Sequence, residues 1–298
     1  MPLADAKQSE ATEKSARLHT GSVRIVAPAR LHLGFLDLNG DLGRMFGSIG
    51  LAINLPRTEL ILKRSHAYKG EGPDYARAVA TIHRLAEKYA LTSAYDVKIV
   101  SAIPPHAGLG SGTQLALAAG AALMTLEGIG HEPARLGEMV ERGARSAIGM
   151  AAFEHGGFIV DGGRGALDRA PPILVQSKFP NAWRALLVMD ASTAGVHGID
   201  EAEAFAALPP LPADQAAHVC RLVLMQLVPG LMESDIAAFG DALTEIQKIV
   251  GGHFANAQGG SPWTSPGVER VVEAMRAAGA YGLGQSSWGP TGFAFAPS

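Results

Sequence analysis

A glycine-rich stretch in the first half of the chain, IPPHAGLGSGTQLALAAGAAL from Ile103, has the composition of an anion-binding loop. Two prolines and three glycines come directly before a segment rich in alanine and leucine, which predicts a helix. Glycine lets the backbone approach a ligand, and the N–H groups and dipole at a helix start favour negative charge. Ser111 and Thr113 can cap the helix or donate hydroxyls to a phosphate or a metal. The pattern predicts a phosphate site about as readily as a tight turn with Ser111 as its cap.

The loop differs from the common motifs that bind nucleotides or carry a nucleophile. The chain has no Gly-Lys pair, which excludes a P-loop, and Gly108, Gly110 and Gly112 do not match the dinucleotide fingerprint. Neither GLGSGT nor GQSSWG gives Gly-x-Ser-x-Gly, so no hydrolase elbow is predicted, and no zinc signature is present. No nicotinamide or flavin cofactor is therefore expected. The predicted binding loop comprises Pro105, Gly108, Leu109, Gly110, Ser111, Gly112 and Thr113.

Two other stretches combine polar side chains with glycines. In APARLHLGFLDLNG, Arg30 and His32 follow a predicted strand and, being two residues apart, face the same way. Arginine can hold a phosphate or carboxylate with two parallel hydrogen bonds, and histidine suits acid–base work or contact with an oxyanion. A solvated arginine beside a structural histidine is the alternative. GLGQSSWGPTGFAF, from Gly282, is either a second ligand loop or a hairpin turn. Its candidate binding residues are Ser286, Ser287, Trp288 and Gly289.

Hydrophobic periodicity predicts the elements that position these stretches. Apolar residues recur at helical spacing between Tyr75 and Tyr89, so 74–90 is predicted to be an amphipathic helix. The strand at 183–190 is apolar enough to be buried on both faces. Strands and helices do not alternate strictly, which predicts an α+β fold. The other predicted helices span residues 113–126, 133–145, 214–228, 233–250 and 267–278, and the other strands span 22–29, 57–63, 95–101 and TGFAF.

Composition excludes several classes of partner. The 298 residues are 47% hydrophobic and 18% charged, with a net charge of −3, so we expect a sizeable core and no nucleic-acid partner. The single cysteine, Cys220, lies in an apolar run, which fits a core thiol and a reducing, cytoplasmic setting. No signal peptide or membrane span is apparent. Residues 1–20 are predicted to be a flexible tail, 21–178 a first domain and 179–298 a second, with the boundary in GGRGALDRAPPILVQSKFPN.

The three stretches, in this order, resemble the motifs of the GHMP kinase superfamily, named for galactose, homoserine, mevalonate and phosphomevalonate kinases. APARLHLG is similar to its first motif, IPPHAGLGSGTQLALA to its second and GLGQSSWGPTGFAF to its third. The resemblance implies a two-domain α+β fold, with an N-terminal half like ribosomal protein S5 domain 2 and a ferredoxin-like C-terminal half. Such a half ordinarily continues with one more helix and strand, so a C-terminal piece could be missing.

One departure from the kinases concerns proton chemistry. The kinases carry a catalytic aspartate in a Ser-Gly-x-Asp context after the helix that follows the second motif. Here the corresponding run is ARSAIGMAAFEHGGFIVDGG, and Gly149 stands in the place of the aspartate. A glycine cannot abstract a proton or orient a hydroxyl nucleophile. Trp288 and Pro290 also occupy a third loop that usually holds glycine and small residues.

These departures resemble one branch of the superfamily, the beta-ribofuranosylaminobenzene 5'-phosphate synthases. The runs that resemble the branch closely are RLHLGFLDLNGDLGRMFGSIGLAI, AIGMAAFEHGGFIVDGG and GQSSWGPT. The resemblance implies condensation of phosphoribosyl pyrophosphate with 4-aminobenzoate or 4-hydroxybenzoate, with release of pyrophosphate and carbon dioxide, in methanopterin biosynthesis. The usual acidic phosphoribosyltransferase signature is absent, so the glycine-rich loop would have to hold the diphosphate.

The implied reaction gives expected roles to individual residues. Ser111 and Thr113 would neutralise the diphosphate together with Mg²⁺, whose expected protein ligands are Ser111 and Glu154. A carboxylate would stabilise positive charge at the ribose anomeric carbon, although Asp161 in VDGG is about as readily a simple turn residue. The predicted catalytic residues are Arg30, His32, Glu154 and Asp161. Further candidates are Asp190 for the anomeric centre, Arg44 for the benzoate carboxylate, Phe35 and Trp288 for its ring, and His106 and His155 for phosphate.

Two other functions remain open on the sequence. An ATP-dependent small-molecule kinase would need Asp161 or Asp190 to replace the missing base, and Gly149 argues against it. A non-catalytic metabolite sensor would not need the polar groups that all three stretches retain. The apolar helix near 219–228 could serve a homodimer.

Overall fold

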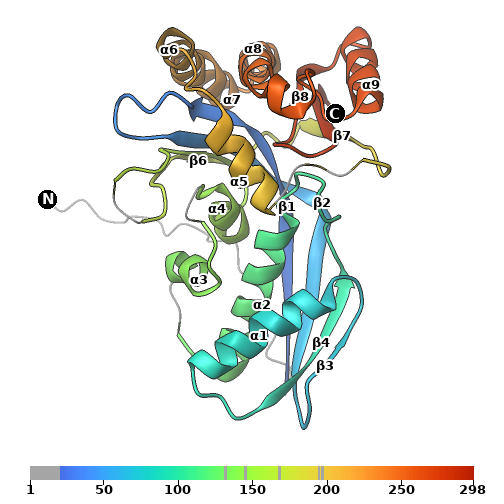
Figure 1. Ribbon diagram of the computed structural model, residues 1–298. Helices are drawn as coiled ribbons and strands as arrows, with labels where there is room; N and C mark the ends of the chain where they lie inside the picture. Colours follow the sequence, from blue (N-terminus) through green and yellow to red (C-terminus); the bar gives the residue numbers. More distant parts are fainter. Residues whose placement is uncertain (1–20, 131–132, 144–145, 167–168, 194, 196–197) are drawn as a thin grey trace, which may run out of the picture.

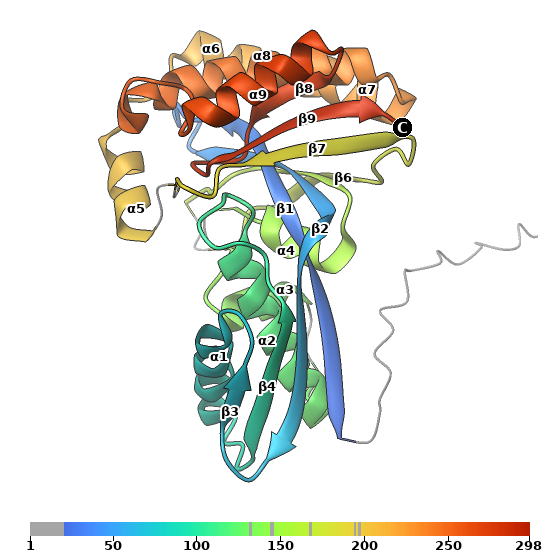
Figure 2. The ribbon, with the colours of Figure 1, turned by 90° about the vertical axis from the view of Figure 1, so that its right-hand side faces the viewer.

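The computed structural model describes residues 21–298 except 131–132, 144–145, 167–168, 194 and 196–197 (Figure 1). The predicted tail at 1–20 lies outside the described residues. In the part of the chain that is described, no helix is both long and apolar enough to cross a membrane. The molecule has an elongated lower half, built from the first part of the chain, and an upper half that carries the C-terminal helices (Figures 1 and 2).

The lower half is organised around two long antiparallel strands, β1 and β2. Residues Leu60–Ser65 of β2 pair with β4, whereas Ile49–Leu51 pair with β5, so one strand connects two parts of the sheet. β1 pairs with the other edge of β2 along nearly its whole length. The strands are β1 (Ser22–Asp37), β2 (Phe46–Ser65), β3 (Lys69–Glu71), β4 (Ala94–Ser101), β5 (Phe158–Asp161) and β6 (Ile173–Ser177).

Helix α2 (Ser111–Glu127) is the central helix of the lower half. Every residue from Gln114 to Met124 is buried, because α2 packs against both β1 and β2 and is covered by α1 (Tyr75–Lys88). The small side chains of its alanines and Gly120 allow this close packing on all sides. Two short helices, α3 (Pro133–Met139) and α4 (Ile148–His155), complete this half, and α4 packs beside α2.

The upper half contains a three-stranded antiparallel sheet in the order β7-β9-β8. Helices α8 and α9 lie on one face of this sheet (Figure 2). Asp235 caps α8 by accepting hydrogen bonds from the N–H groups of Ala237 and Ala238, and Ser265 caps α9 in the same manner. The elements are β7 (Trp183–Met189), α5 (Gly198–Ala207), α6 (Ala213–Leu222), a π-helical turn at Val223–Leu227, α7 (Val228–Glu233), α8 (Ile236–Phe254), a 3₁₀ turn at Ala255–Gln258, α9 (Pro266–Ala277), β8 (Tyr281–Gln285) and β9 (Thr291–Pro297).

The mixed α and β architecture confirms the predicted fold class, but several local predictions differ from the structure. β1 and β2 are much longer than predicted, so Arg30 and His32 lie inside β1 and not after a strand. β7 is not buried on both faces, since Leu186 is 36% and Met189 45% exposed. The predicted helix at 214–228 contains the π-helical turn, where Leu224 and Met225 face solvent. The dimer surface expected there stays a prediction.

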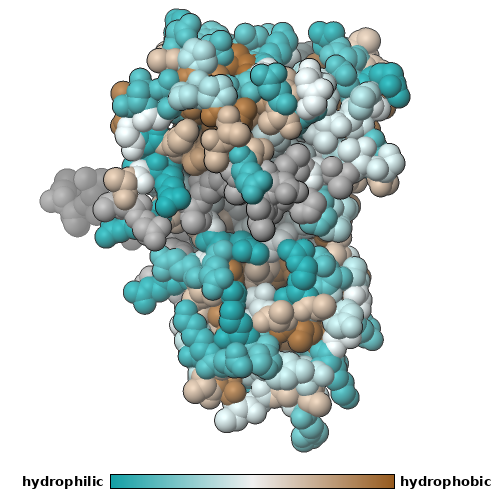
Figure 3. All heavy atoms as spheres, in the orientation of Figure 1, coloured by the Kyte–Doolittle hydropathy of each residue, from teal (hydrophilic) through white to brown (hydrophobic). Residues whose placement is uncertain are grey.

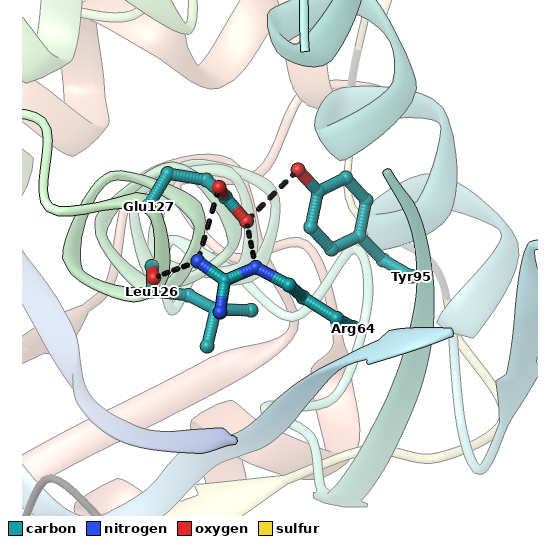
Figure 4. Close-up of polar contacts among 4 residues, drawn as sticks. All are labelled: Arg64, Tyr95, Leu126 and Glu127. Carbon is teal, nitrogen blue, oxygen red and sulfur yellow. Dashed lines mark hydrogen bonds and ion pairs between the residues drawn. The ribbon is translucent and has the colours of Figure 1, made fainter. Parts of the chain in front are cut away.

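An ion-pair network joins the end of α2 to the sheet (Figure 4). The Glu127 carboxylate accepts two hydrogen bonds from the Arg64 guanidinium, at 2.9 and 3.1 Å, and one from the Tyr95 hydroxyl, at 3.1 Å. Arg64 also donates to the Leu126 carbonyl at 2.8 Å, next to the C-terminal end of the helix dipole. Burial and the neighbouring carboxylate raise the pKa of Tyr95, so its hydroxyl stays a donor.

We predict that Glu127→Gln lowers the free energy of unfolding by about 1–3 kcal/mol, because a charge-assisted bidentate pair is lost beside the largely buried Tyr95 ring. Urea denaturation of the variant and of the unmodified protein measures the difference. Glu273→Gln is the matched control, because its partner Arg276 lies on an exposed face of α9. Equal losses in the two variants would contradict a special role for the Glu127 network.

Candidate active site

The predicted binding loop lies on Arg30 of β1. The Arg30 guanidinium donates a hydrogen bond of 2.9 Å from Nη1 to the Gly108 carbonyl, and the Arg30 N–H donates to the Leu109 carbonyl at 3.1 Å. Gly110 has a φ of +76° and faces the Arg30 side chain so closely that a Cβ there would lie 3.2 Å from its Cγ. Arg30 therefore fixes the loop and places a positive charge directly beside it.

The third glycine-rich stretch closes onto the binding loop from the upper half. The Ser286 hydroxyl donates to the Gly108 carbonyl at 2.8 Å, and the Thr291 hydroxyl donates to the Ala107 carbonyl at 2.7 Å. A Cβ at Gly289 would collide with the backbone of Ala107 and Gly108, so this contact requires a glycine. The two loops form one unit although they are far apart in the sequence.

The first predicted stretch completes this unit. The backbone N–H of His32 donates to the Ser286 hydroxyl at 2.9 Å, so Ser286 connects β1 to the binding loop. The His32 ring is nearly buried and lies 4.4 Å from the Phe35 ring, measured between centroids. Gln247 of α8 adds a further connection, because its amide donates to the Leu33 carbonyl and accepts from the Gln285 N–H. The three stretches thus meet in space.

The start of α2 is open to a ligand. Its N-cap is Gly110 in the left-handed conformation, and no side chain caps the helix. The predicted cap, Ser111, lies within the first turn. The first N–H groups of a helix need partners, and the helix dipole favours an anion there. The arrangement is that of an anion site formed by Gly110, Ser111, Gly112 and Thr113, with Arg30 behind it.

Gly149 lies against this helix start. A Cβ at Gly149 would stand 3.0 Å from Cγ2 of Thr113, and the Gly149 carbonyl accepts a hydrogen bond of 2.8 Å from the Gln114 amide. Gln114 is fully buried, and its Oε1 has no hydrogen-bond partner. The place that holds the catalytic aspartate in the kinases is therefore next to the loop, but it carries no side chain here.

Asp161 has a structural environment. It is fully buried, and its carboxylate accepts four hydrogen bonds, from the N–H groups of Ser48, Ala147 and Gly163 and from the Ser146 hydroxyl. These bonds join β2, the start of α4 and the turn after β5. The structure favours the turn alternative over direct contact with a substrate. Asp161 can still act indirectly, because it holds the segment that leads to Gly149.

The other candidate carboxylates differ in their surroundings. Asp190 follows β7 and accepts hydrogen bonds from the hydroxyls of Ser192, Thr193 and Ser265 and from the Ser192 N–H, which hold its pKa well below the ordinary range. Asp190 therefore stays ionised but is occupied in connecting β7 to the cap of α9. Glu154 ends α4, where one oxygen lies 3.6 Å from Nε2 of the exposed His155.

Within the described ranges, no three histidine, cysteine, aspartate or glutamate side chains gather into a metal site. Mg²⁺ is commonly bound through one or two protein groups and the phosphates of its substrate. The Ser111 hydroxyl at the loop fits such a site, whereas Glu154 is provided by another helix. An ion at this loop would depend mainly on phosphate oxygens and water.

Several further candidates are engaged within the fold. Arg44 donates to the carbonyls of Gly162 and Gly163, at 2.8 and 2.7 Å. Phe35 and Trp288 both belong to a buried aromatic cluster, where the Trp288 ring lies 4.5 Å from the Phe254 ring. Phe35 also lines a small hollow together with His32 and Ser287. Trp288 supports the third loop from within, although its Nε1 has no hydrogen-bond partner. Cys220 is only partly buried and does not belong to the core, and this partial burial raises the pKa of its thiol. His106 precedes the loop in a left-handed conformation, with its carbonyl bonded to the Gly195 N–H, and Ser287 is likewise left-handed.

The sequence analysis missed two contributors to the site. Gly195 packs against the third loop, because a Cβ there would collide with the Trp288 carbonyl. Arg77 of α1 approaches Gly112, where an added Cβ would lie 2.7 Å from its Nη2 atom. Neither residue belongs to a local motif, and the only available signal for Arg77 was its place on the predicted amphipathic helix.

If Asp161 is structural, Asp161→Asn should unfold at lower denaturant concentration, with a loss of about 1–3 kcal/mol, because the amide nitrogen would face N–H donors that need an acceptor. Chemical denaturation measures this effect. Asp41→Asn, at an exposed position, is the control. A variant with unchanged stability and abolished activity would instead point to direct catalysis by Asp161.

Comparison with known proteins places this chain in a family. The models for the GHMP kinase N-terminal and C-terminal domains match residues 75–157 and 227–298. Beta-ribofuranosylphenol 5'-phosphate synthase of Archaeoglobus fulgidus is 33% identical over 294 residues, covering 93% of this chain and 88% of that protein. The protein of the same name from Methanothermobacter thermautotrophicus is 32% identical over 288 residues, covering 89% of this chain and 86% of that protein.

The fold likeness extends to solved structures. Phosphomevalonate kinase of Streptococcus pneumoniae superposes with a TM-score of 0.69, covering 93% of this chain and 92% of that chain at 14% identity. These comparisons confirm the family resemblance inferred from the three stretches, with the phenol name in place of the aminobenzene name. The chain belongs to the GHMP kinase superfamily and, within it, to the family of the beta-ribofuranosylphenol 5'-phosphate synthases.

Proposed function

We propose that this protein is a phosphoribosyl transferase that joins the ribosyl phosphate of phosphoribosyl pyrophosphate to a 4-substituted benzoate, releasing pyrophosphate and carbon dioxide. The observation that carries the proposal is the uncapped start of α2, enclosed by Arg30 and the third loop, with Gly149 in the place of a kinase base. The name of the relatives describes a product with a ribofuranosyl group, a phenol and a 5'-phosphate. That product matches the 4-hydroxybenzoate alternative.

The bond changes of the proposed reaction balance without a proton transfer. The bond between the ribose anomeric carbon and the diphosphate oxygen breaks, and its electron pair leaves with pyrophosphate. A pair of ring electrons forms the new carbon–carbon bond at the ring atom that carries the carboxylate. The pair of the carboxylate bond then returns to the ring as carbon dioxide leaves. A site for this reaction needs to stabilise a departing anion, and it needs no base to deprotonate a hydroxyl.

The geometry supports a site that stabilises a departing anion and contains no base at position 149. The N–H groups at the start of α2 and the hydroxyls of Ser111 and Thr113 can donate hydrogen bonds to the diphosphate oxygens. Mg²⁺ bound at Ser111 and the phosphates would add positive charge to the leaving group. Arg30 supplies charge beside the loop, and its bond to the Gly108 carbonyl keeps the loop in shape. The kinase alternative lacks a residue at position 149 that could activate an alcohol.

Incubations with phosphoribosyl pyrophosphate and, in parallel, with ATP test the proposal. The protein is given Mg²⁺, phosphoribosyl pyrophosphate and carboxyl-labelled 4-hydroxybenzoate or 4-aminobenzoate, and released label and pyrophosphate are measured. We expect equal amounts of both products, and the faster benzoate identifies the substituent. Parallel incubation with ATP and homoserine or mevalonate should yield no phosphorylated alcohol. ATP-dependent phosphorylation without label release would overturn the proposal in favour of a kinase.

Arg30→Ala should lower kcat/KM for phosphoribosyl pyrophosphate about 10²-fold or more. Loss of a charged hydrogen bond at a site that excludes water costs about 2–5 kcal/mol, and about 1.4 kcal/mol corresponds to a factor of ten. Arg30→Lys should restore only part of the rate, because lysine lacks the planar fork. Circular dichroism confirms folding, and Arg276→Ala serves as the control for loss of a distant arginine. Unmodified kinetics in Arg30→Ala would remove Arg30 from the site.

Restoring an acid at position 149 should not create a kinase. In Gly149→Asp the carboxylate would stand beside Thr113 and the bound diphosphate, so we expect weaker pyrophosphate binding in calorimetry and no ATP turnover. Gly149→Ala adds the same Cβ without the charge and separates steric from electrostatic loss. Gly110→Val is a poor test of the same loop, because Gly110 has a φ of +76° and its Cβ would press on Arg30. ATP-dependent phosphorylation by Gly149→Asp would mean that the kinase machinery is otherwise intact.

A further inference from the structure

A second positively charged hollow lies beside the binding loop, on the side facing α1. It has a volume of about 350 Å³ and lies between α1, the first turns of α2 and the segment 140–142. Hydrophilic residues gather over the left-hand part of α1 in this view, and apolar residues lie among them toward its other end (Figure 3). Three arginines line it, Arg77 and Arg84 from α1 and Arg142 from the segment after α3, and Gly112 forms part of its wall. Gly112 therefore borders both the loop and the hollow.

Arg77 is held close to the bare backbone of Gly112. An ideal Cβ on Gly112 would lie 2.7 Å from Nη2 and 3.8 Å from Cζ of Arg77. Both atoms belong to the Arg77 guanidinium group. Gly112 has no left-handed conformation that would require glycine. The absent side chain thus leaves room for the guanidinium at the helix start. The contact gives a structural reason for a glycine inside the first turn of α2, besides the approach of a ligand to the bare backbone.

The arginines have weak partners that an anion could replace. Arg77 pairs with Asp74 at 3.0 Å, and Arg84 pairs with Glu141 at 2.7 Å. The Glu141 side chain is 71% exposed, and Arg142 donates to the Glu141 backbone carbonyl at 3.0 Å. Exposed ion pairs contribute little to stability, because water and salt screen them. Among the described residues, two carboxylates pair with three guanidinium groups at the hollow, which leaves a positive balance.

We propose that this hollow binds the 5'-phosphate of the phosphoribosyl ligand, with Arg77 as its main contact across Gly112. The inference rests on the proposed function. A phosphoribosyl diphosphate carries anions at both ends of its ribose, and the loop between Gly108 and Thr113 accounts for only one of them. Arginine matches a phosphate with paired hydrogen bonds, and a phosphate group fits easily in the volume available. The ribose would then lie over the first turn of α2.

Calorimetry with ribose 5-phosphate, in the presence of saturating pyrophosphate and Mg²⁺, tests the site directly. Pyrophosphate occupies the loop, so the sugar phosphate reports on the second site. In Arg77→Ala we expect at least a tenfold loss of ribose 5-phosphate affinity, since a charged hydrogen bond is removed, and a change of less than twofold for pyrophosphate alone. Arg276→Ala, on α9, should change neither affinity. Unchanged ribose 5-phosphate affinity in Arg77→Ala would overturn the proposal.

Gly112→Ala provides a second variant that keeps every charge. The new methyl group would displace the Arg77 guanidinium, while alanine inside a helix favours folding over glycine. We expect an unchanged or higher melting temperature together with weaker ribose 5-phosphate binding. Gly252→Ala in α8, where a Cβ would meet nothing, is the matched control. Weaker binding in both alanine variants, or in neither, would contradict the role of Arg77.

Turnover separates this proposal from the proposed function. If the unmodified protein releases carbon dioxide from a benzoate, but Arg77→Ala has the same KM for phosphoribosyl pyrophosphate, the 5'-phosphate site is wrong and the proposed function stands. If the unmodified protein does not turn over, the proposed function fails. In that case Arg77-dependent binding of ribose 5-phosphate would still establish the hollow as a sugar-phosphate site.

Discussion

The backbone contact between two glycine-rich loops is the constraint on which the rest of the site depends. Gly289 lies so close to Ala107 and Gly108 that no side chain fits between them. The Ser286 hydroxyl then connects the His32 N–H to the Gly108 carbonyl, so a strand and two loops share one polar atom. Because these segments come from both halves of the chain, the anion site exists only when the halves are packed together.

The packing of these loops also sets which backbone groups near the start of α2 have hydrogen-bond partners. The third loop and Arg30 satisfy the carbonyls at Ala107, Gly108 and Leu109, whereas no side chain caps the start of α2. The uncapped helix end would be unfavourable in an empty, dry environment, because its donors have no internal partner. A phosphate supplies both the missing acceptors and the opposite charge. The proposed preference of this site for phosphate therefore depends more on backbone N–H groups than on side chains.

Local sequence patterns predicted the glycine-rich loops of the site, but not every residue that contacts them. The glycines and prolines around Gly108 predict a loop, because these residue types restrict or widen the backbone conformations of the segment in which they lie. Strand β2 was predicted only from Arg57 onward, since the glycines and Pro56 that precede Arg57 are typical of a loop. Pairing with β1 and β5 makes this part of β2 a strand. Helix α4 was not predicted from the sequence, because its eight residues are too few to show a helical period. Arg77 and Gly195 reach the site through tertiary packing, for which the sequence carries no local signal.

The same constraint explains how one loop can support different reactions. Phosphoryl transfer to an alcohol needs an anion site and a base, whereas loss of pyrophosphate from a sugar carbon needs the anion site alone. Gly149 packs on Thr113 and its carbonyl is held by Gln114, so the backbone beside the loop stays ordered although the side chain is absent. A glycine at position 149 therefore removes a base without disturbing the helix start that we propose as the phosphate site. In the proposed reaction, a single side chain next to the loop thus separates phosphoryl transfer from loss of pyrophosphate, since the backbone that would bind the phosphate is the same in both.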